Sequence, residues 1–253
     1  TLPCFGEAVP LMMLQDVETV IAQAVSRARE ISPQSVIAVV DREGFVLGVC
    51  SLNPNIAAFD TTDLPISTND VANAIAKAGT AAFLSSTEHA FTSRTAGFIV
   101  QQHFPPEVLT QPPGPLVGVN FSSMSFSDVN RYKGPPFGPA MKSGTNGQAV
   151  PMPPTGGLDG SPSGVPLYKN GKLIGGVGVA GDGDAATDIQ TNQVYDVDED
   201  VALAGQIGFE PNEAILGSHV FIDGIRVAYV NSGTSLPKTI PAFKSEPIDA
   251  AKE

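Results

Sequence analysis

The side chains of this sequence that could do chemistry are few and widely spaced. Its histidines are His89, His103 and His219. An imidazole can act near neutral pH as an acid, a base or a metal ligand. His103 and His89 lie nearer in sequence than His219 to an alanine-rich segment at 69–84, so they are the preferred ligand candidates. A histidine at an arbitrary position is more often structural or solvated, and that alternative stays open.

Two cations and one hydroxyl are further candidates for ligand binding. Lys77 falls within the alanine-rich segment, and Arg94 comes shortly after it. Either cation could hold a carboxylate group, although a surface salt bridge is the plain alternative. Thr80 could donate a hydrogen bond to a ligand or could simply cap and pack.

An acidic stretch, "GDGDAATD", resembles a calcium loop and contains Asp182, Asp184 and Asp188. It fails the EF-hand pattern, because counting from Asp182 places Gln193 where that loop needs a bidentate glutamate. A calcium site of another kind, made by the three aspartates, remains one interpretation. A solvated acidic loop is the other.

Motifs for hydrolysis or nucleotide binding are missing from the sequence. There is no Gly-x-Ser-x-Gly elbow and no His-Glu-x-x-His pair, the arrangements that activate a serine or hold a catalytic zinc. No pair of acid and base residues stands out by spacing. The sequence therefore indicates no catalytic mechanism, and whether the protein is an enzyme stays open.

Composition excludes some classes of partner. The chain has 253 residues and a formal net charge of −12, which argues against nucleic acid and against anionic membrane surfaces. The longest apolar runs are strand-sized, so we expect no membrane insertion. The first residue is Thr1, so a removed leader or a trimmed chain is expected. Abundant Thr, Ser, Asn, Gly and Pro with few Lys favours a periplasmic or secreted protein.

The cysteines are Cys4 and Cys50. In an exported protein they could form one disulfide. Two separate buried thiols are the alternative.

Hydrophobic periodicity predicts four helices, at 12–31, 69–84, about 92–104 and about 198–207. The second is lined with alanine. Small side chains allow a close approach, either by a neighbouring backbone in tight helix–sheet packing or by a flat ligand.

Three segments each show a short apolar run, a polar turn with glycine, and a second apolar run. They lie at 35–49, 166–181 and 219–231. The pairs Asn170-Gly171 and Asp223-Gly224 are typical of two-residue hairpin turns. Three hairpins predict one antiparallel sheet of about six strands with helices against it, an α+β fold.

We expect a single domain over residues 1–253, interrupted by a long irregular insertion rich in proline and glycine at 105–162. Such a loop is usually functional or disordered, and this one is expected to wrap the domain or a neighbouring subunit. An extended C-terminal tail is expected at 232–253.

Taken in order, several segments resemble the GlcG/HbpS family, described as haem-binding or haem-degrading domains. The similarity covers roughly residues 11–104 and 163–208, and its most specific parts are "KAGTA" from Lys77 and "GGVGV" from Gly175. The insertion, residues 182–197 and the third hairpin lie outside the pattern, which suggests a longer exported subtype. Where the family often has a histidine, in the first hairpin, this chain has Phe45, so no role carries over there.

The resemblance implies a profilin-like α+β fold, homo-oligomers and a crevice for haem or another small ligand. Haem needs an apolar slot, an axial ligand and often a cation for its propionates. His103 and His89 become candidate axial ligands, while Lys77, Arg94 and Thr80 become candidate contacts to the rest of the cofactor.

The leading interpretation is a non-covalent haem-binding protein that stores, senses, carries or slowly degrades haem. It could also serve electron transfer beside cytochromes or other exported proteins. One alternative is an assembly module of the same fold that holds partner subunits without haem. Another is an enzyme for a small carboxylate or hydroxy acid, with Lys77 and Arg94 holding the anion.

Overall fold

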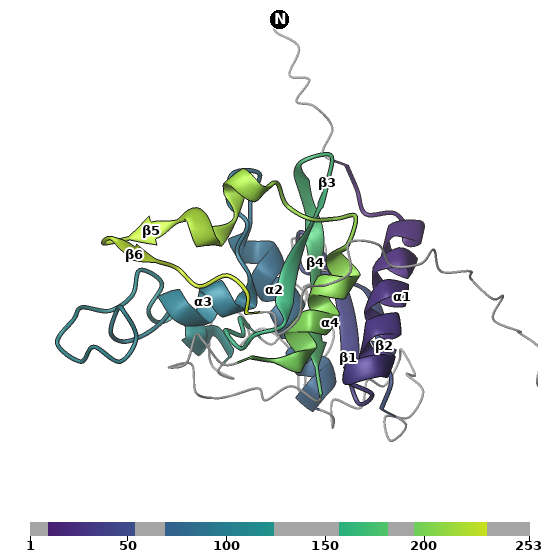
Figure 1. Ribbon diagram of the computed structural model, residues 1–253, viewed down its shortest axis with the longest axis horizontal. Helices are drawn as coiled ribbons and strands as arrows, with labels where there is room; N and C mark the ends of the chain where they lie inside the picture. The colour runs from purple at the N-terminus through teal and green to yellow at the C-terminus, as the bar shows by residue number, and fades with distance from the viewer. Residues whose placement is uncertain (1–9, 54–68, 124–156, 182–194, 232–253) are drawn as a thin grey trace, which may run out of the picture.

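The computed structural model describes residues 10–53, 69–123, 157–181 and 195–231. At its centre two hairpins form an antiparallel four-stranded sheet. The strands are β1 Val36–Asp41, β2 Val46–Ser51, β3 Gly164–Lys169 and β4 Lys172–Ala180. Their order is β2-β1-β4-β3, so the hairpins join through their inner strands β1 and β4 (Figure 1).

Helices flank this sheet, which confirms the predicted α+β class. They are α1 Leu14–Ile31, α2 Asn69–Leu84, α3 Ser93–Ile99 and α4 Val197–Gln206. Their bounds agree closely with the predictions, except at the end of α3. Within the described segments, none of the helices combines the length and the apolar character that a membrane crossing requires.

The turn between β3 and β4 forms as its sequence predicts. Asn170 and Gly171 both have positive φ angles, 53° and 72°. A type I′ turn requires that conformation at both central residues, and asparagine and glycine adopt it at least cost. The turn thereby fixes the register that pairs Lys169 with Lys172.

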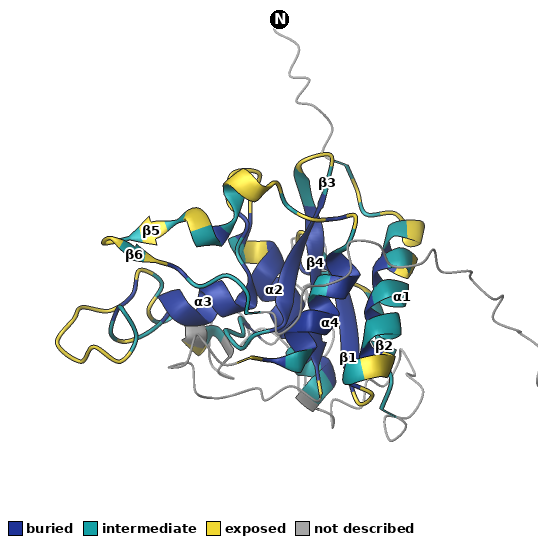
Figure 2. Ribbon diagram, in the orientation of Figure 1, coloured by how far each residue is buried: buried dark blue, intermediate teal, exposed yellow. Residues whose placement is uncertain are grey.

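The two faces of the sheet bury different helices. Ile37 and Val39 of β1 point toward α1 and α4, whereas Val36, Ala38 and Val40 point toward α2. Successive side chains of a strand alternate between faces, so the run "VIAVV" supplies both cores. Figure 2 shows the consequence: β1, β4 and α2 are dark blue, while α1 is largely teal on its solvent side.

Helix α2 lies unusually close to β4. A Cβ atom built on Gly178 would lie 2.2 Å from the backbone oxygen of Ala74, and one built on Gly176 would lie 2.4 Å from that of Ala78. The glycines of β4 and the alanines of α2 therefore allow backbone-to-backbone contact. Of the two alternatives for the alanine-lined helix, the structure shows tight helix–sheet packing. Strand β4, and not a flat ligand, fills this face of α2.

The prediction of a six-stranded sheet is wrong. The third hairpin forms strands β5 Phe221–Ile222 and β6 Ile225–Arg226, which make a separate two-stranded sheet. Ile222 and Ile225 pack on a small cluster around α3. A further strand could have joined the main sheet at its edge strand β3. There, however, the Tyr168 amide already donates to the Phe209 carbonyl at 2.8 Å.

Helix α3 ends earlier than predicted, at Ile99 instead of near 104. Its last carbonyls find partners outside the helix: the Gln101 side chain donates to Gly97 at 2.6 Å, and the Leu116 amide donates to Ile99 at 3.1 Å. The helix can stop because these bonds replace the next helical turn. Most of the predicted insertion, and all of the predicted tail, lie outside the described residues.

Candidate functional site

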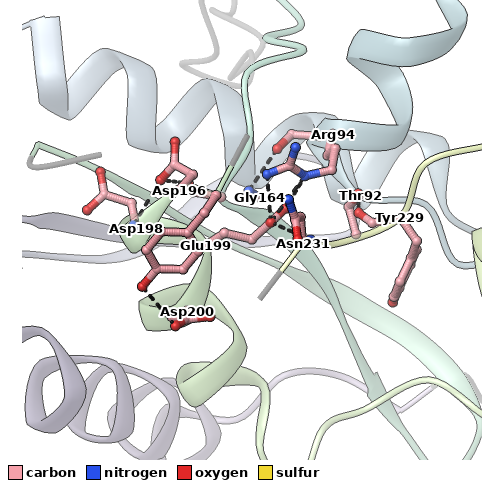
Figure 3. A network of polar contacts seen from close by, with 12 residues as sticks. Thr92, Arg94, Gly164, Asp196, Asp198, Glu199, Asp200, Tyr229 and Asn231 are labelled. Carbon is pink, nitrogen blue, oxygen red and sulfur yellow. Dashed lines mark hydrogen bonds and ion pairs between the residues drawn. The ribbon is translucent and has the colours of Figure 1, made fainter. Parts of the chain in front are cut away.

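A set of buried polar side chains comes from α2, from α3, from the residue before β3 and from the start of α4. Figure 3 shows Arg94, Asp196, Asp198 and Glu199 of this set. All are between 0% and 3% exposed. We call this set the polar seam; its members are Lys77, Thr80, Ser93, Arg94, Ser163, Asp196, Asp198 and Glu199. Buried charges are expensive unless they are paired or hydrogen-bonded, so each of these charged groups needs a partner inside the protein.

The acidic side of the polar seam is built by the start of α4. Asp196 is the N-cap residue: its Oδ1 accepts from the Asp198 amide at 2.9 Å and from the Ser163 hydroxyl at 3.1 Å. Asp198 in turn accepts from the Ser32 hydroxyl at 2.7 Å. The helix macrodipole and the exposed amides of the first turn favour negative charge at this position.

An ion pair links α3 to α4. Arg94 donates from Nε and from Nη2 to the Glu199 carboxylate, at 3.0 Å to Oε1 and 2.9 Å to Oε2. The Asn231 amide adds a third donor at 2.8 Å. Burial raises the pKa of Glu199, and the Arg94 guanidinium opposes that rise. The pair therefore ties three segments together in the interior.

Lys77 of α2 contributes the second cation of the polar seam. Its ammonium donates to the backbone oxygen of Val179 at 3.1 Å. Burial raises the pKa of Asp196, and the charge of Lys77 is the largest influence acting against that rise. Lys77 and Asp196 therefore attract each other electrostatically within the polar seam.

Thr80 is fully engaged within the protein. Its hydroxyl donates to the Ala76 carbonyl at 2.7 Å and accepts from the Asp159 amide at 2.8 Å. The hydroxyl thereby fixes the chain just before β3 against α2.

The two preferred histidines lie away from the polar seam. His89 is exposed in the connection between α2 and α3, with its ring 5.8 Å from that of Phe91. His103 follows α3, and its Nδ1 lies 2.9 Å from the Gln111 carbonyl oxygen. Of the predicted site residues, the structure thus brings together Lys77, Thr80 and Arg94. Their roles toward a ligand stay predictions.

Surface salt bridges, the plain alternative for Lys77 and Arg94, are wrong, because both side chains are buried. The predicted calcium ligands Asp182, Asp184 and Asp188 lie outside the described residues. Among the residues that are described, no group of three acidic, histidine or cysteine side chains could hold a metal ion. Cys50 is a free thiol there, and Cys4 lies outside this part of the chain.

Sequence reasoning missed the acidic half of the polar seam. Asp198 and its neighbours in "DVDED" suit a helix start, because acids there complement the helix dipole, but that pattern alone does not show that they are buried. A signal was present: Lys77 interrupts a nearly continuous small-residue helix, and an apolar run directly follows the acids. A charge on a face that must be buried predicts a buried partner of the opposite sign.

Comparisons with known proteins give distant structural similarity. No family model matches the sequence, and no curated protein matches it. Solved structures similar to this chain include protein ORFY of Klebsiella pneumoniae, at 19% identity and a TM-score of 0.44, covering 81% of this chain and 95% of that one.

The structure of a PduOC–haem complex is similar at 17% identity and a TM-score of 0.44, covering 80% of this chain and 98% of that one. A double mutant of HbpS from Streptomyces reticuli is similar at 16% identity and a TM-score of 0.39, covering 81% of this chain and 94% of that one.

Proposed function

We propose that this chain binds haem without a covalent link and that His103 is the axial ligand. The observation that carries the proposal is the 2.9 Å contact between His103 Nδ1 and the Gln111 carbonyl oxygen. A carbonyl oxygen only accepts, so Nδ1 is the donor in this contact, and in that tautomer Nε2 carries the lone pair that can bind iron. Histidines that bind metals are commonly oriented by such a bond.

The residues around His103 suit a flat apolar cofactor. Phe104 packs edge-on against Phe98, with ring centroids 5.2 Å apart. The segment that follows exposes large apolar side chains, which on a protein surface often mark a binding site. These are Val108, Leu109, Val117 and Phe121. The resemblance of the sequence to the GlcG/HbpS family supplies haem as the class of ligand.

The remaining candidates contribute less to this proposal. His89 is exposed, and its ring nitrogens have no hydrogen bond among the described residues. Arg94 is bound to Glu199, so it would have to change partners to hold a propionate. Lys77 lies in the interior between Val179 and the acidic side of the polar seam. We therefore place the haem propionates toward solvent, at the edge of the exposed apolar surface that follows His103.

Haem titration followed by visible absorption tests the proposal. The full chain should develop a Soret band that saturates near one haem per chain. His103→Ala should weaken binding by at least tenfold or shift the band, because the iron loses its protein ligand. The matched control is His89→Ala, which should leave both the band and the affinity unchanged. A chain that ignores haem, or a band indifferent to His103→Ala, contradicts the proposal.

A second candidate function is assembly with other subunits. Leu11, Met13 and Leu14, at the start of α1, are 71%, 60% and 72% exposed. Such an apolar row favours a protein contact, and we propose homo-oligomers in an exported protein. Sedimentation of the full chain tests this, because Leu11→Ser with Leu14→Ser should then shift the oligomer toward monomers. Sedimentation of the wild-type chain as a monomer would contradict it.

A further inference from the structure

We infer that Lys77 and Asp196 flank a binding site for one neutral hydroxyl oxygen, which accepts from the Lys77 ammonium and donates to Asp196 Oδ2. The oxygen belongs either to water or to a small alcohol. This inference stands apart from the haem proposal, because it concerns the interior of the polar seam and not the surface at His103.

The first support is the incomplete hydrogen bonding of Lys77. The side chain is 1% exposed, and its ammonium donates once, to Val179. An ammonium carries three N–H donors. In the described part of the chain Lys77 has no further partner, so two donors of a buried cation remain unused.

The second support comes from Asp196, which is also 1% exposed. Its Oδ1 holds the Asp198 amide and the Ser163 hydroxyl, whereas its Oδ2 is buried without a hydrogen bond. Figure 3 shows the carboxylate at the start of α4, with its drawn bond directed to Asp198. Buried polar atoms in native structures nearly always have a partner, and a missing one often marks water, an ion or a ligand.

The third support is the separation of the two groups. The charge of Lys77 acts on Asp196, yet no ion pair within 4.0 Å joins these two described side chains. One oxygen that bonds to both would hold them about 5.5 to 6 Å apart, since each hydrogen bond spans about 2.7 to 3.0 Å. A bridging oxygen therefore accounts for an attraction between two groups that make no direct ion pair.

The charges of the polar seam favour a neutral ligand. Arg94 and Glu199 neutralise each other in direct contact, and Lys77 balances Asp196, while the third carboxylate, Asp198, accepts from the Ser32 and Ser35 hydroxyls. An anion would lie beside two carboxylates, and a cation beside an ammonium, each in a medium that strengthens repulsion. A hydroxyl group avoids both costs because it accepts and donates at once.

Close packing keeps the ligand small. A Cβ built on Gly164 would lie 2.2 Å from the backbone oxygen of Lys77 and 2.9 Å from the hydroxyl oxygen of Ser93. The backbone of Lys77 is thus already in contact with β3, which favours a ligand no larger than water or a small alcohol.

A crystal structure of the full chain, at a resolution that shows bound water, tests the inference directly. We expect one oxygen within about 3.2 Å of both Lys77 Nζ and Asp196 Oδ2. A direct Lys77–Asp196 ion pair, or a dry gap between the groups, overturns the inference. Soaking with methanol separates the sources: added density for a methyl group identifies an alcohol site, and unchanged density identifies a water site.

Substitutions give a second test. Lys77→Met removes the donor and keeps the length of the side chain, so the bridging oxygen should disappear. Lys169→Met, the same change at a lysine that pairs with Asp16 outside the polar seam, should leave the oxygen in place. Persistence of the oxygen in Lys77→Met overturns the inference.

If Lys77→Met does not fold, nuclear magnetic resonance of the wild-type chain replaces it. The Lys77 ammonium should show a cross-peak to a long-lived water, or to methanol once it is added. Absence of both cross-peaks overturns the inference.

Discussion

Arg94 on α3 and Glu199 on α4 form a bidentate ion pair inside the protein, with Nη2 and Oε2 2.9 Å apart and both side chains almost fully buried. Removing one member leaves the other charge in the interior without its partner. We predict that Glu199→Ala lowers the free energy of unfolding by about 3 to 5 kcal/mol, as measured by urea denaturation.

The control for this ion pair is Glu30, which pairs with Arg27 at 3.0 Å but is 65% exposed. Glu30→Ala should cost less than about 1 kcal/mol, because exposed pairs contribute little. Equal losses for the two variants would show that the Arg94–Glu199 pair does not hold α3 to α4.

Gly178 offers a test of the contact between α2 and β4. In Gly178→Ala the new Cβ would lie 2.2 Å from the Ala74 oxygen and 2.5 Å from the Ala78 nitrogen. Helix and strand must separate, so we predict a loss of about 1 to 3 kcal/mol, measured by thermal unfolding. Gly171→Ala is the control: nothing lies within 4 Å, and its cost is that of the positive φ alone. A smaller loss at Gly178 than at Gly171 would contradict the contact.

Asp196 should make stability depend on pH. Burial raises the pKa of its carboxyl in the native state, whereas aspartate in an unfolded chain titrates near about 3.9. The native state therefore binds the proton more tightly, and this contribution to stability is lost as pH rises through the native pKa. Asp196→Asn removes this pH-dependent contribution, because an amide does not titrate.

We predict that Asp196→Asn gains stability relative to wild type as pH rises from about 4 toward neutrality. Urea denaturation at a series of pH values measures that difference. A difference that stays constant over the series would show that Asp196 does not titrate abnormally.

Tyr168 should resist ionisation. Burial raises its pKa to about 12, and its hydroxyl donates to the Ser86 carbonyl at 2.6 Å. The stability it contributes is present below the unfolded pKa and is lost as pH rises through the native value. Alkaline titration followed by phenolate absorption should show a late step that Tyr168→Phe removes. Loss of an earlier step instead would refute this assignment.

The sequence predicted local structure better than assembly. The turn at Asn170-Gly171 and the first turn of α4 were predictable, because glycine, asparagine and acidic residues have local backbone preferences. The number of strands in the main sheet was not. The third hairpin has the same turn signal as the second, but Ile222 and Ile225 are partly buried against the cluster that contains Phe104. That contact is a tertiary one, which no local pattern encodes.

The candidate site was predictable only on one side. Lys77, Thr80 and Arg94 were selected from their place in a small-residue segment, and the structure brings them together. Their acidic partners Asp196 and Glu199 were not selected, since acids at a helix start are usually exposed. Only the packing of α4 against the sheet reveals that these acids face inward.

The pairing of β1 with β4 has a consequence for how the chain folds. Val36 lies opposite Ala180, so more than half of the chain must close into a loop before the two central strands can meet. Each hairpin forms from neighbouring residues and can do so early, whereas the closure of long loops is slow and delays non-local pairing. Refolding should therefore be limited by the meeting of the two hairpins, and inserting residues between 124 and 156 should slow refolding more than it lowers stability.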